Sequence, residues 1–201
     1  MDRRSNNIAI FQDSMDMIKA SQKLQQAVQL SIQNQKLYVP SQAIALPESG
    51  KSPCKTIVSS KRSFEAASAY AKSGKRVCVL NFASATNPGG GVTRGSTAQE
   101  ECLCRCSTLY PCLDTETMWH QFYQQHRKTG DPLYNDDLLY TPGVVIFKTD
   151  TSVPERMEEK DWYQVDIITC AAPNLRKKPS NAMNPSAGNA PVKISEKALY
   201  E

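Results

Sequence analysis

The feature that most constrains the fold of this chain is an apolar run that ends in a glycine-rich loop. Residues 76–83, RVCVLNFA, have the composition of a buried β-strand. The loop SATNPGGGV follows directly, and its Pro and three consecutive Gly end the strand pattern. In α/β sheets, a loop after the carboxyl end of a strand is where ligands commonly bind. The sequence therefore predicts an α/β fold with a site at this loop.

The segments around this loop alternate between strand and helix patterns, which is typical of an α/β domain. We expect the strands 54–60 and 76–83, joined by a helix over 62–74, to form a parallel pair. The other predicted elements are one helical segment over 7–37, helices over 97–113 and 115–130 separated near 111–114, strands over 144–150 and 163–173, a loop over 174–192 and a helix from Ser195.

Composition and charge exclude several classes of protein. Of the 201 residues, 40% are hydrophobic and 22% are charged, close to the averages for soluble globular proteins. The net charge of +4 lies in short clusters, which argues against nucleic-acid binding as the main role. No apolar run reaches the ~20 residues that a membrane-spanning helix requires, so we expect no membrane partner. The length favours one catalytic or binding domain with appendages. We expect a helical N-terminal extension over residues 1–50 and the main domain over residues 51–201.

The cysteines indicate a reducing compartment. Their number, seven, is odd, and the opening residues MDRRSNNIAIFQD are polar where a signal peptide needs an apolar core. Both observations predict a cytoplasmic location. Cys102, Cys104 and Cys106 are separated by single residues, whereas zinc sites pair cysteines that are about two to four residues apart. We therefore expect buried structural cysteines and no metal.

Two adjacent carboxylates, Glu100 and Glu101, open the helix that is predicted after the glycine loop. Thr97 and Glu100 have the spacing of a capping box, in which the Glu100 carboxylate would bond back to the backbone of Thr97. One carboxylate suffices for that cap, and a second beside it adds like-charge repulsion, so Glu101 needs another explanation. Glycine N–H groups and the positive end of a helix can together approach an anion. The pattern is neither a Walker P-loop nor the dinucleotide fingerprint.

A longer motif joins the loop to the carboxylates: Asn87-Pro88-Gly89-Gly90-Gly91, then seven residues, then Gln99-Glu100-Glu101. This motif resembles the signature of the poly(ADP-ribose) glycohydrolases, which is three Gly, a short spacer and Gln-Glu-Glu on a macrodomain. The stretches VLNFASATNPGGG and VDIITCAAPN are similar to the microbial branch of that family, which has a helical N-terminal extension. The resemblance spans most of the chain.

The resemblance implies a macrodomain-like mixed sheet flanked by helices, and hydrolysis of the ribose–ribose O-glycosidic bond with release of ADP-ribose. Glu101 would protonate the leaving ribose hydroxyl and then activate water, in line with carboxylate assistance in glycosidases. Glu100 would position the neighbouring ribose, and Asn87 would bind the distal ribose. The motif requires no metal and no cofactor. The remaining ligand-binding candidates that the resemblance implies are Gly89, Gly90, Gly91 and Gln99.

The sequence also departs from the family pattern. A macrodomain of this type continues with another strand, a second glycine-rich loop and closing helices, so we expect the domain to be incomplete at its C-terminus. An incomplete sheet leaves an unpaired edge, which favours self-association. The expected partner is poly(ADP-ribose) or an ADP-ribosylated protein. Two alternatives stay open: a non-catalytic ADP-ribose-binding macrodomain, and an inactive truncated remnant held in an oligomer.

Three other polar residues have a structural interpretation. His120 and His126 are six residues apart, off any shared helical face, and we expect them to be surface or structural residues. Asp166, in the strand pattern YQVDIITC, is either a satisfied structural carboxylate or an acid that touches a base or ribose, and the first interpretation is favoured.

Overall fold

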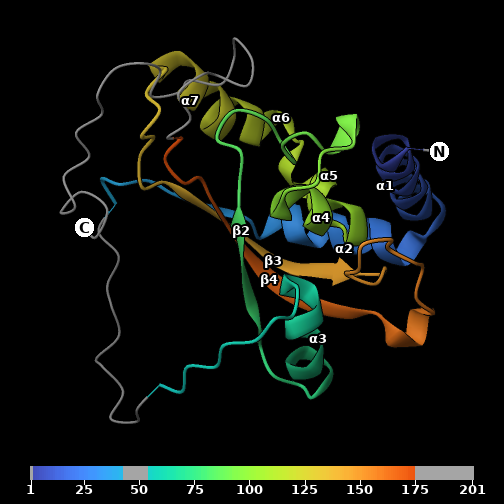
Figure 1. The fold of residues 1–201 in the computed structure, drawn as a ribbon. Helices are drawn as coiled ribbons and strands as arrows, with labels where there is room; N and C mark the ends of the chain where they lie inside the picture. Colours follow the sequence, from blue (N-terminus) through green and yellow to red (C-terminus); the bar gives the residue numbers. More distant parts are fainter. Residues whose placement is uncertain (1, 43–53, 175–201) are drawn as a thin grey trace.

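The fold is a mixed four-stranded sheet with helices packed on it (Figure 1). The structure is a computed structural model, and it describes residues 2–42 and 54–174. The strand order is β1-β3-β4-β2, with β2 parallel to β4 and the other two pairs antiparallel. This architecture confirms the predicted α/β class with a mixed sheet. The strands are β1 (Lys36–Tyr38), β2 (Cys78–Phe82), β3 (Leu138–Ile146) and β4 (Tyr163–Cys170).

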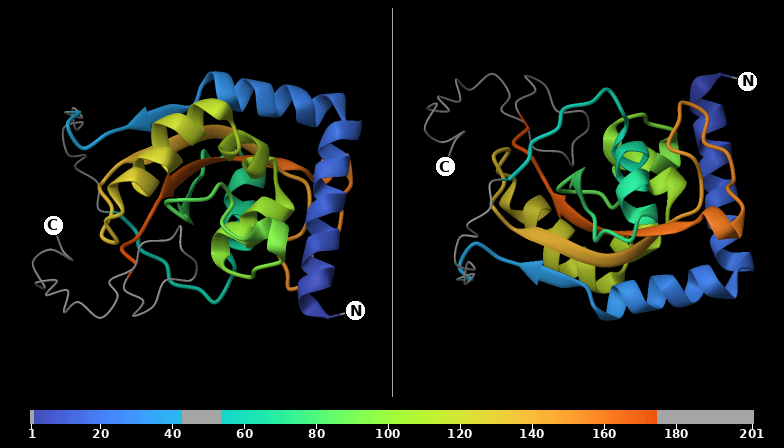
Figure 2. Two further views of the ribbon diagram at one scale, coloured as in Figure 1. Left: turned by 90° about the horizontal axis from the view of Figure 1, so that it is seen from above. Right: turned by 90° about the horizontal axis from the view of Figure 1, so that it is seen from below.

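The helices cover the sheet and surround its end near the glycine loop. In the described part of the chain, α2 packs on β3, α3 on β4 and α4 on β2, while α1 and α2 run along the outside of the domain (Figure 2). The helices are α1 (Arg3–Ala20), α2 (Gln22–Gln33), α3 (Ser63–Lys72), α4 (Gln99–Cys106), α5 (Leu109–Leu113), α6 (Glu116–Met118) and α7 (Gln124–Thr129), with 3₁₀ turns at Val92–Arg94 and Glu159–Asp161 and a π-helical turn at Trp119–Tyr123.

The N-terminal segment predicted to be helical over 7–37 forms two helices, α1 and α2, and only its last residues differ, because they belong to β1. Ser21 has an extended backbone, with φ −107° and ψ 112°, and separates α1 from α2. Its hydroxyl accepts a hydrogen bond from the Leu24 N–H at 3.3 Å, because Ser is a favoured N-cap residue. The segment then ends in β1, which pairs with β3.

Two predictions for the glycine-loop side of the sheet are wrong, which are the strand over 54–60 and its parallel pairing with the strand over 76–83. Residues 54–60 form no strand, and the side chain of Val58 is 92% exposed. The parallel partner of β2 is therefore β4 and not this segment. Among the described strands β2 lies at an edge, with Leu80 and Phe82 exposed and only the alternate residues buried. A continuous apolar run predicts that a strand forms, but it does not predict whether the strand lies at the centre or at the edge of the sheet.

The exposed edge of β2 is occupied in part by a side chain. The amide of Gln99 accepts a hydrogen bond from the Phe82 N–H at 2.8 Å and donates one to the Leu80 carbonyl at 2.7 Å. These two bonds take the place of a neighbouring strand. They also fix the first residue of α4 to β2, and so set where the two following glutamates lie.

The helix predicted over 97–113 is divided at one more point than expected. The chain leaves α4 at Ser107, which is extended and forms a bridge with Ile146 of β3. The predicted separation near 111–114 is present, because α5 ends at Leu113 and α6 begins at Glu116. Pro111 itself lies in the first turn of α5. Proline is tolerated there because the first N–H groups of a helix have no partner within the helix. The helix predicted over 62–74 is confirmed as α3, with Gly74 just past its end at φ +79°.

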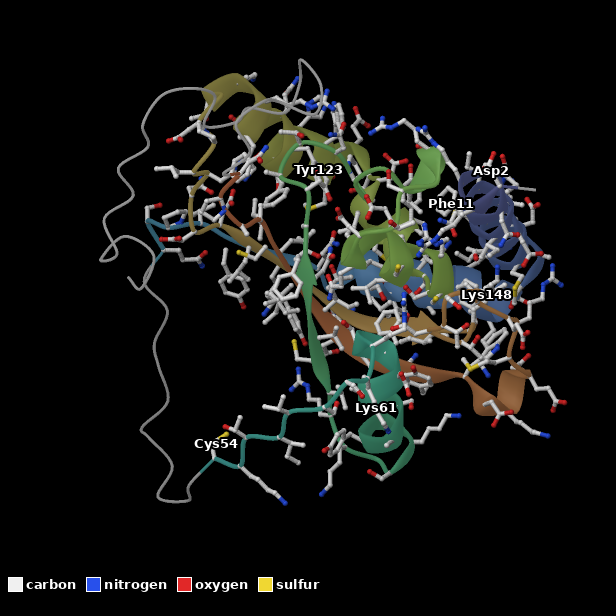
Figure 3. The ribbon with its side chains drawn as sticks, viewed as in Figure 1. Asp2, Phe11, Cys54, Lys61, Tyr123 and Lys148 are labelled. Carbon is white, nitrogen blue, oxygen red and sulfur yellow. The ribbon has the colours of Figure 1, made fainter. Side chains whose placement is uncertain are left out.

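Helix α1 is attached to the domain through a buried cation. The ammonium of Lys148, 1% exposed, lies 2.8 Å from Asp13 of α1 and donates to the Ile10 carbonyl at 2.8 Å. Hydrogen bonds from Arg156 and Lys148 lower the pKa of Asp13 to about 2. Phe11 of the same helix packs edge-on against Tyr110. Figure 3 shows Phe11 and Lys148 on the side of the molecule that α1 occupies.

The described residues contain neither a membrane-spanning helix nor a cluster of metal ligands. No helix there is long and apolar enough to cross a membrane. No cluster of three or more His, Cys, Asp or Glu side chains there could hold a metal ion. The predicted loop over 174–192, apart from Asn174, and the helix predicted from Ser195 lie outside the described residues.

Candidate active site

A cavity of ≈ 1030 Å³ lies where β2 ends, between the glycine loop and the first turn of α4. Its wall brings together five of the site residues predicted from the sequence, which are Asn87, Gly90, Gly91, Glu100 and Glu101. A smaller cavity of ≈ 410 Å³ between α2 and β3 contains none of them. The remaining wall residues of the large cavity are Phe82, Ala83, Ser84, Ala85, Arg94, Ser96, Thr97, Ala98, Tyr134, Ala172, Pro173 and Asn174.

The carboxyl group of Glu101 is buried, with one oxygen tethered to the glycine loop. Its Oε1 atom accepts a hydrogen bond from the Gly91 N–H at 2.8 Å, and the residue is 6% exposed. Its Oε2 atom is buried without a hydrogen-bond partner among the described residues. Buried carboxyl oxygens are normally paired, and exceptions of this kind point to a catalytic or binding role. Glu101 thus offers one oxygen to a ligand in the cavity.

Glu100 is bound to β2 and the segment after it, so the predicted capping box is wrong. Its Oε2 accepts from the Ser84 N–H at 2.8 Å and its Oε1 from the Asn81 amide at 3.3 Å. The N-cap residue of α4 is Ala98, which has no side-chain cap. Burial, with a smaller contribution from the charge of Glu101, raises the pKa of Glu100 to about 8. Glu100 therefore carries its proton at neutral pH.

Gly90 lies against both carboxyl groups. A Cβ atom at this position would be 2.6 Å from Oε1 of Glu101 and 3.0 Å from Oε2 of Glu100. The residue also has φ +59°, a conformation that side chains disfavour. Only glycine can therefore bring the backbone of the loop so close to the two carboxyls.

The amide of Asn87 is held by an arginine that the sequence analysis missed. Arg127 of α7 donates from Nη2 to Asn87 Oδ1 and from Nε to the Thr86 carbonyl, both at 2.7 Å. The guanidinium lies over the ring of Trp119 at 4.5 Å from its centroid. Arg127 is 40 residues from Asn87, and no sequence pattern connects the two. Asn81 was also missed, although a polar residue inside the apolar run RVCVLNFA was a signal for it.

Two predicted site residues, Gly89 and Gln99, are not on the cavity wall. Gly89 begins the tight turn of the loop, and its φ is +62°. The Gln99 amide also donates to Ser63 Oγ at 3.1 Å, in addition to its two bonds to the backbone of β2. Gln99 thus holds α4 in place, and its role as a ligand-binding residue stays a prediction.

The histidines and Asp166 have structural contacts, as expected. His120 is exposed, and the buried His126 pairs through Nε2 with Asp137 Oδ1 at 3.0 Å. His126 also lies edge-on to Tyr134, a residue of the cavity wall, at 5.5 Å between the ring centres. Asp166 accepts hydrogen bonds from Arg76, Tyr140 and the Gly143 N–H, and it is not part of the cavity wall.

Comparisons with known proteins show which family the chain is similar to. Residues 9–149 match a family model described as microbial-type PARG, catalytic domain. No curated protein matches the chain. The crystal structure of poly(ADP-ribose) glycohydrolase (PARG) from Thermomonospora curvata is 32% identical to it, with a TM-score of 0.73 over 85% of this chain and 65% of that chain. The same enzyme bound to the inhibitor ADP-HPD is 30% identical, with a TM-score of 0.65 over 85% and 64%.

A second bacterial enzyme is also similar. PARG from Deinococcus radiodurans in complex with ADP-ribose is 33% identical, with a TM-score of 0.60 over 73% of this chain and 58% of that chain. The chain thus spans less than two thirds of the length of these solved structures.

Proposed function

The chain belongs to the microbial-type poly(ADP-ribose) glycohydrolase family, and we propose that it hydrolyses the ribose–ribose O-glycosidic bond of poly(ADP-ribose) and releases ADP-ribose. The observation that carries this proposal is the pair of buried carboxyls, Glu100 and Glu101, held against a glycine loop in one large cavity. The relatives solved with ADP-ribose or with ADP-HPD support the class of substrate.

In this proposal Glu101 is the general acid and base. Its Oε2 atom, which has no partner among the described residues, gives a proton to the ribose oxygen as the bond from that oxygen to the anomeric carbon breaks. The resulting carboxylate then takes a proton from the water that attacks the anomeric carbon, which restores the acid. The Gly91 N–H, bonded to Oε1, stabilises the carboxylate between the two steps.

Glu100 positions the ribose and stays uncharged. Because its pKa is raised to about 8, it carries a proton at neutral pH that it can donate in a hydrogen bond to a ribose hydroxyl. A neutral Glu100 also adds no second negative charge beside Glu101 when that residue is ionised. Asn87, fixed by Arg127, binds the distal ribose, and the glycine loop passes close to the ribose and the diphosphate. The proposal includes no metal and no cofactor.

The test is release of free ADP-ribose from poly(ADP-ribosyl)ated protein by this chain. The Glu101→Gln variant should lose release by about 10²–10⁴-fold, because glutamine cannot transfer a proton. Glu116→Gln, on a side chain that is 92% exposed, is the control for the loss of one carboxylate and should release at the wild-type rate. ADP-ribose binding that survives in both variants without release from the wild-type chain would instead support a non-catalytic binding module.

We also propose a cytoplasmic location and self-association through the incomplete sheet. The location is supported by the seven cysteines, none of which forms a disulfide. Self-association is tested by sedimentation of the chain in the buffer of the activity assay. A monomer at all concentrations would refute it.

A further inference from the structure

Helix α1 of the N-terminal extension is hydrogen-bonded to the loop that leads from the glycines to α4. The side-chain amide of Asn7 donates to the Gly95 carbonyl at 3.0 Å, and Asn7 is only 4% exposed. One helical turn earlier, Arg4 donates from Nε to the Arg94 carbonyl at 2.7 Å. A buried amide on a helix surface is costly unless it is paired, so the Asn7 bond specifies where this loop lies.

The contact between α1 and the loop is also a close steric fit. Gly95 has φ +74°, and a Cβ atom at this position would collide with the Arg4 carbonyl oxygen. The two backbones therefore touch, and only a glycine allows it. A displacement of this part of α1 would move the Gly95 segment with it.

The Gly95 segment in turn holds the glycine that binds Glu101. The N–H of Gly95 bonds to the Val92 carbonyl at 3.1 Å, and the N–H groups of Arg94 and Ser96 both bond to the Gly91 carbonyl, at 2.9 and 3.1 Å. These three bonds make residues 91–96 one compact turn. The Gly91 N–H at its start donates to Glu101 Oε1 at 2.8 Å. The path from Asn7 to the carboxyl of Glu101 thus consists of two side-chain bonds and this turn.

The remaining attachments of α1 lie elsewhere in the domain. Ser14 Oγ donates to the main-chain carbonyl of Arg105, in the last turn of α4, at 2.7 Å. Lys148 binds Asp13 and the Ile10 carbonyl at the end of β3. The helix therefore stays docked without the Asn7 bond. Replacing Asn7 therefore tests the contact of α1 with the loop, and replacing Ser14 tests its contact with α4.

We propose that Asn7 is a positioning residue for the hydrolysis: through the Gly95 carbonyl it fixes the turn whose Gly91 N–H orients the carboxyl of Glu101. The inference rests on the proposed function, and it gives the N-terminal extension a part in the site that stability alone does not require.

The experiment compares Asn7→Ala with Ser14→Ala. Each variant removes one buried side-chain hydrogen bond that α1 makes to a carbonyl far away in the sequence, so both should lose similar stability in urea unfolding. Only Asn7→Ala should lower kcat for ADP-ribose release, by about tenfold, since small displacements of catalytic groups are expensive. It should also raise the amide hydrogen-exchange rate of Gly91 by about tenfold. Equal kcat and equal Gly91 exchange in the two variants would overturn the proposal.

A milder pair of variants covers the case in which Asn7→Ala does not fold. Arg4 and Arg3 are adjacent and both exposed, and of the two only Arg4 donates to the loop. Arg4→Ala should speed exchange at Gly91 and lower kcat about twofold, while Arg3→Ala should do neither. Identical behaviour of the two variants would overturn the proposal. A wild-type chain that releases no ADP-ribose would refute the proposed function, and Gly91 exchange would still decide the role of Asn7.

Discussion

Replacing Glu100 by glutamine should stabilise the fold by an amount that grows with pH. The pKa of Glu100 is about 8 in the folded chain, against 4.5 for an ordinary glutamate. A raised pKa means that the contribution of this group to stability is fully present below about pH 4.5 and is lost as the pH rises toward about 8. At about 1.4 kcal/mol per tenfold change in proton affinity, the loss is about 3 kcal/mol at pH 7 and about 5 kcal/mol above pH 8. Glutamine has no charge to lose.

The geometry should accept the substitution. The glutamine oxygen can accept from the Ser84 N–H, and its NH₂ group can donate to the Asn81 amide oxygen once that amide turns over. That oxygen is at present buried without a hydrogen-bond partner in the described part of the structure. The protonated form of Glu100 can make the same two bonds. Glu100→Gln therefore resembles the wild-type chain at low pH and differs from it at high pH.

The assay is urea unfolding followed by circular dichroism at about pH 5, 7 and 9, with wild type, Glu100→Gln and Glu116→Gln measured side by side. The exposed Glu116 controls for the loss of one negative charge. The gain in the free energy of unfolding for Glu100→Gln should be small at the lowest pH and should be larger by about 3–5 kcal/mol at the highest pH. A gain that is the same at all three pH values, or a loss that grows with pH, would refute the argument from burial.

Three further changes have expected outcomes. Arg127→Lys keeps the charge but loses the paired hydrogen bonds to the Asn87 side chain and the Thr86 carbonyl. KM for the polymer should therefore rise about tenfold with little change in kcat, and an unchanged KM in steady-state kinetics would contradict this. Asp13→Asn leaves the buried ammonium of Lys148 without its carboxylate and should lower the free energy of unfolding in urea by about 3 kcal/mol. Lys148→Met should lower it by less, and the reverse order of the two variants would refute the argument. Gly90→Ala should lower ADP-ribose release about 100-fold in a chain that still folds, and wild-type turnover would show that the loop can yield.

The candidate site residues that were singled out from the sequence lie together in the structure because they are close together in the chain. Asn87, the glycines and the two glutamates lie within fifteen residues of one another, and a strand, a tight loop and a helix start bring them to one cavity. The side chains that hold them in place come from elsewhere. Arg127 reaches Asn87 from 40 residues later and Asn7 reaches Gly95 from 88 residues earlier. No periodicity in the chain records such pairs.

For the sheet, too, the sequence predicted local features better than contacts between distant segments. Apolar patterns predicted where β2 and β4 run, because a strand needs only a local run of suitable residues. The strand predicted over 144–150 overlaps only the last residues of β3 (Leu138–Ile146), so the start of that strand was missed. The patterns did not predict that β2 lies at the edge of the described sheet or that residues 54–60 stay outside it. Strand order depends on which faces the helices bury. The capping box failed for a related reason, because a buried partner, Asn81, competes with the backbone for the Glu100 carboxyl.

The bond between Asn7 and Gly95 also bears on how the chain folds. It joins residues 88 positions apart, so forming it closes a long loop at an entropic cost, and contacts of such range slow folding. During synthesis α1 emerges before the glycine loop, so this bond cannot form until the loop has left the ribosome. We therefore expect the geometry of the candidate site to form late in folding, and a slow final phase in the recovery of the proposed activity, after the helices have regained their circular dichroism, would be its kinetic signature.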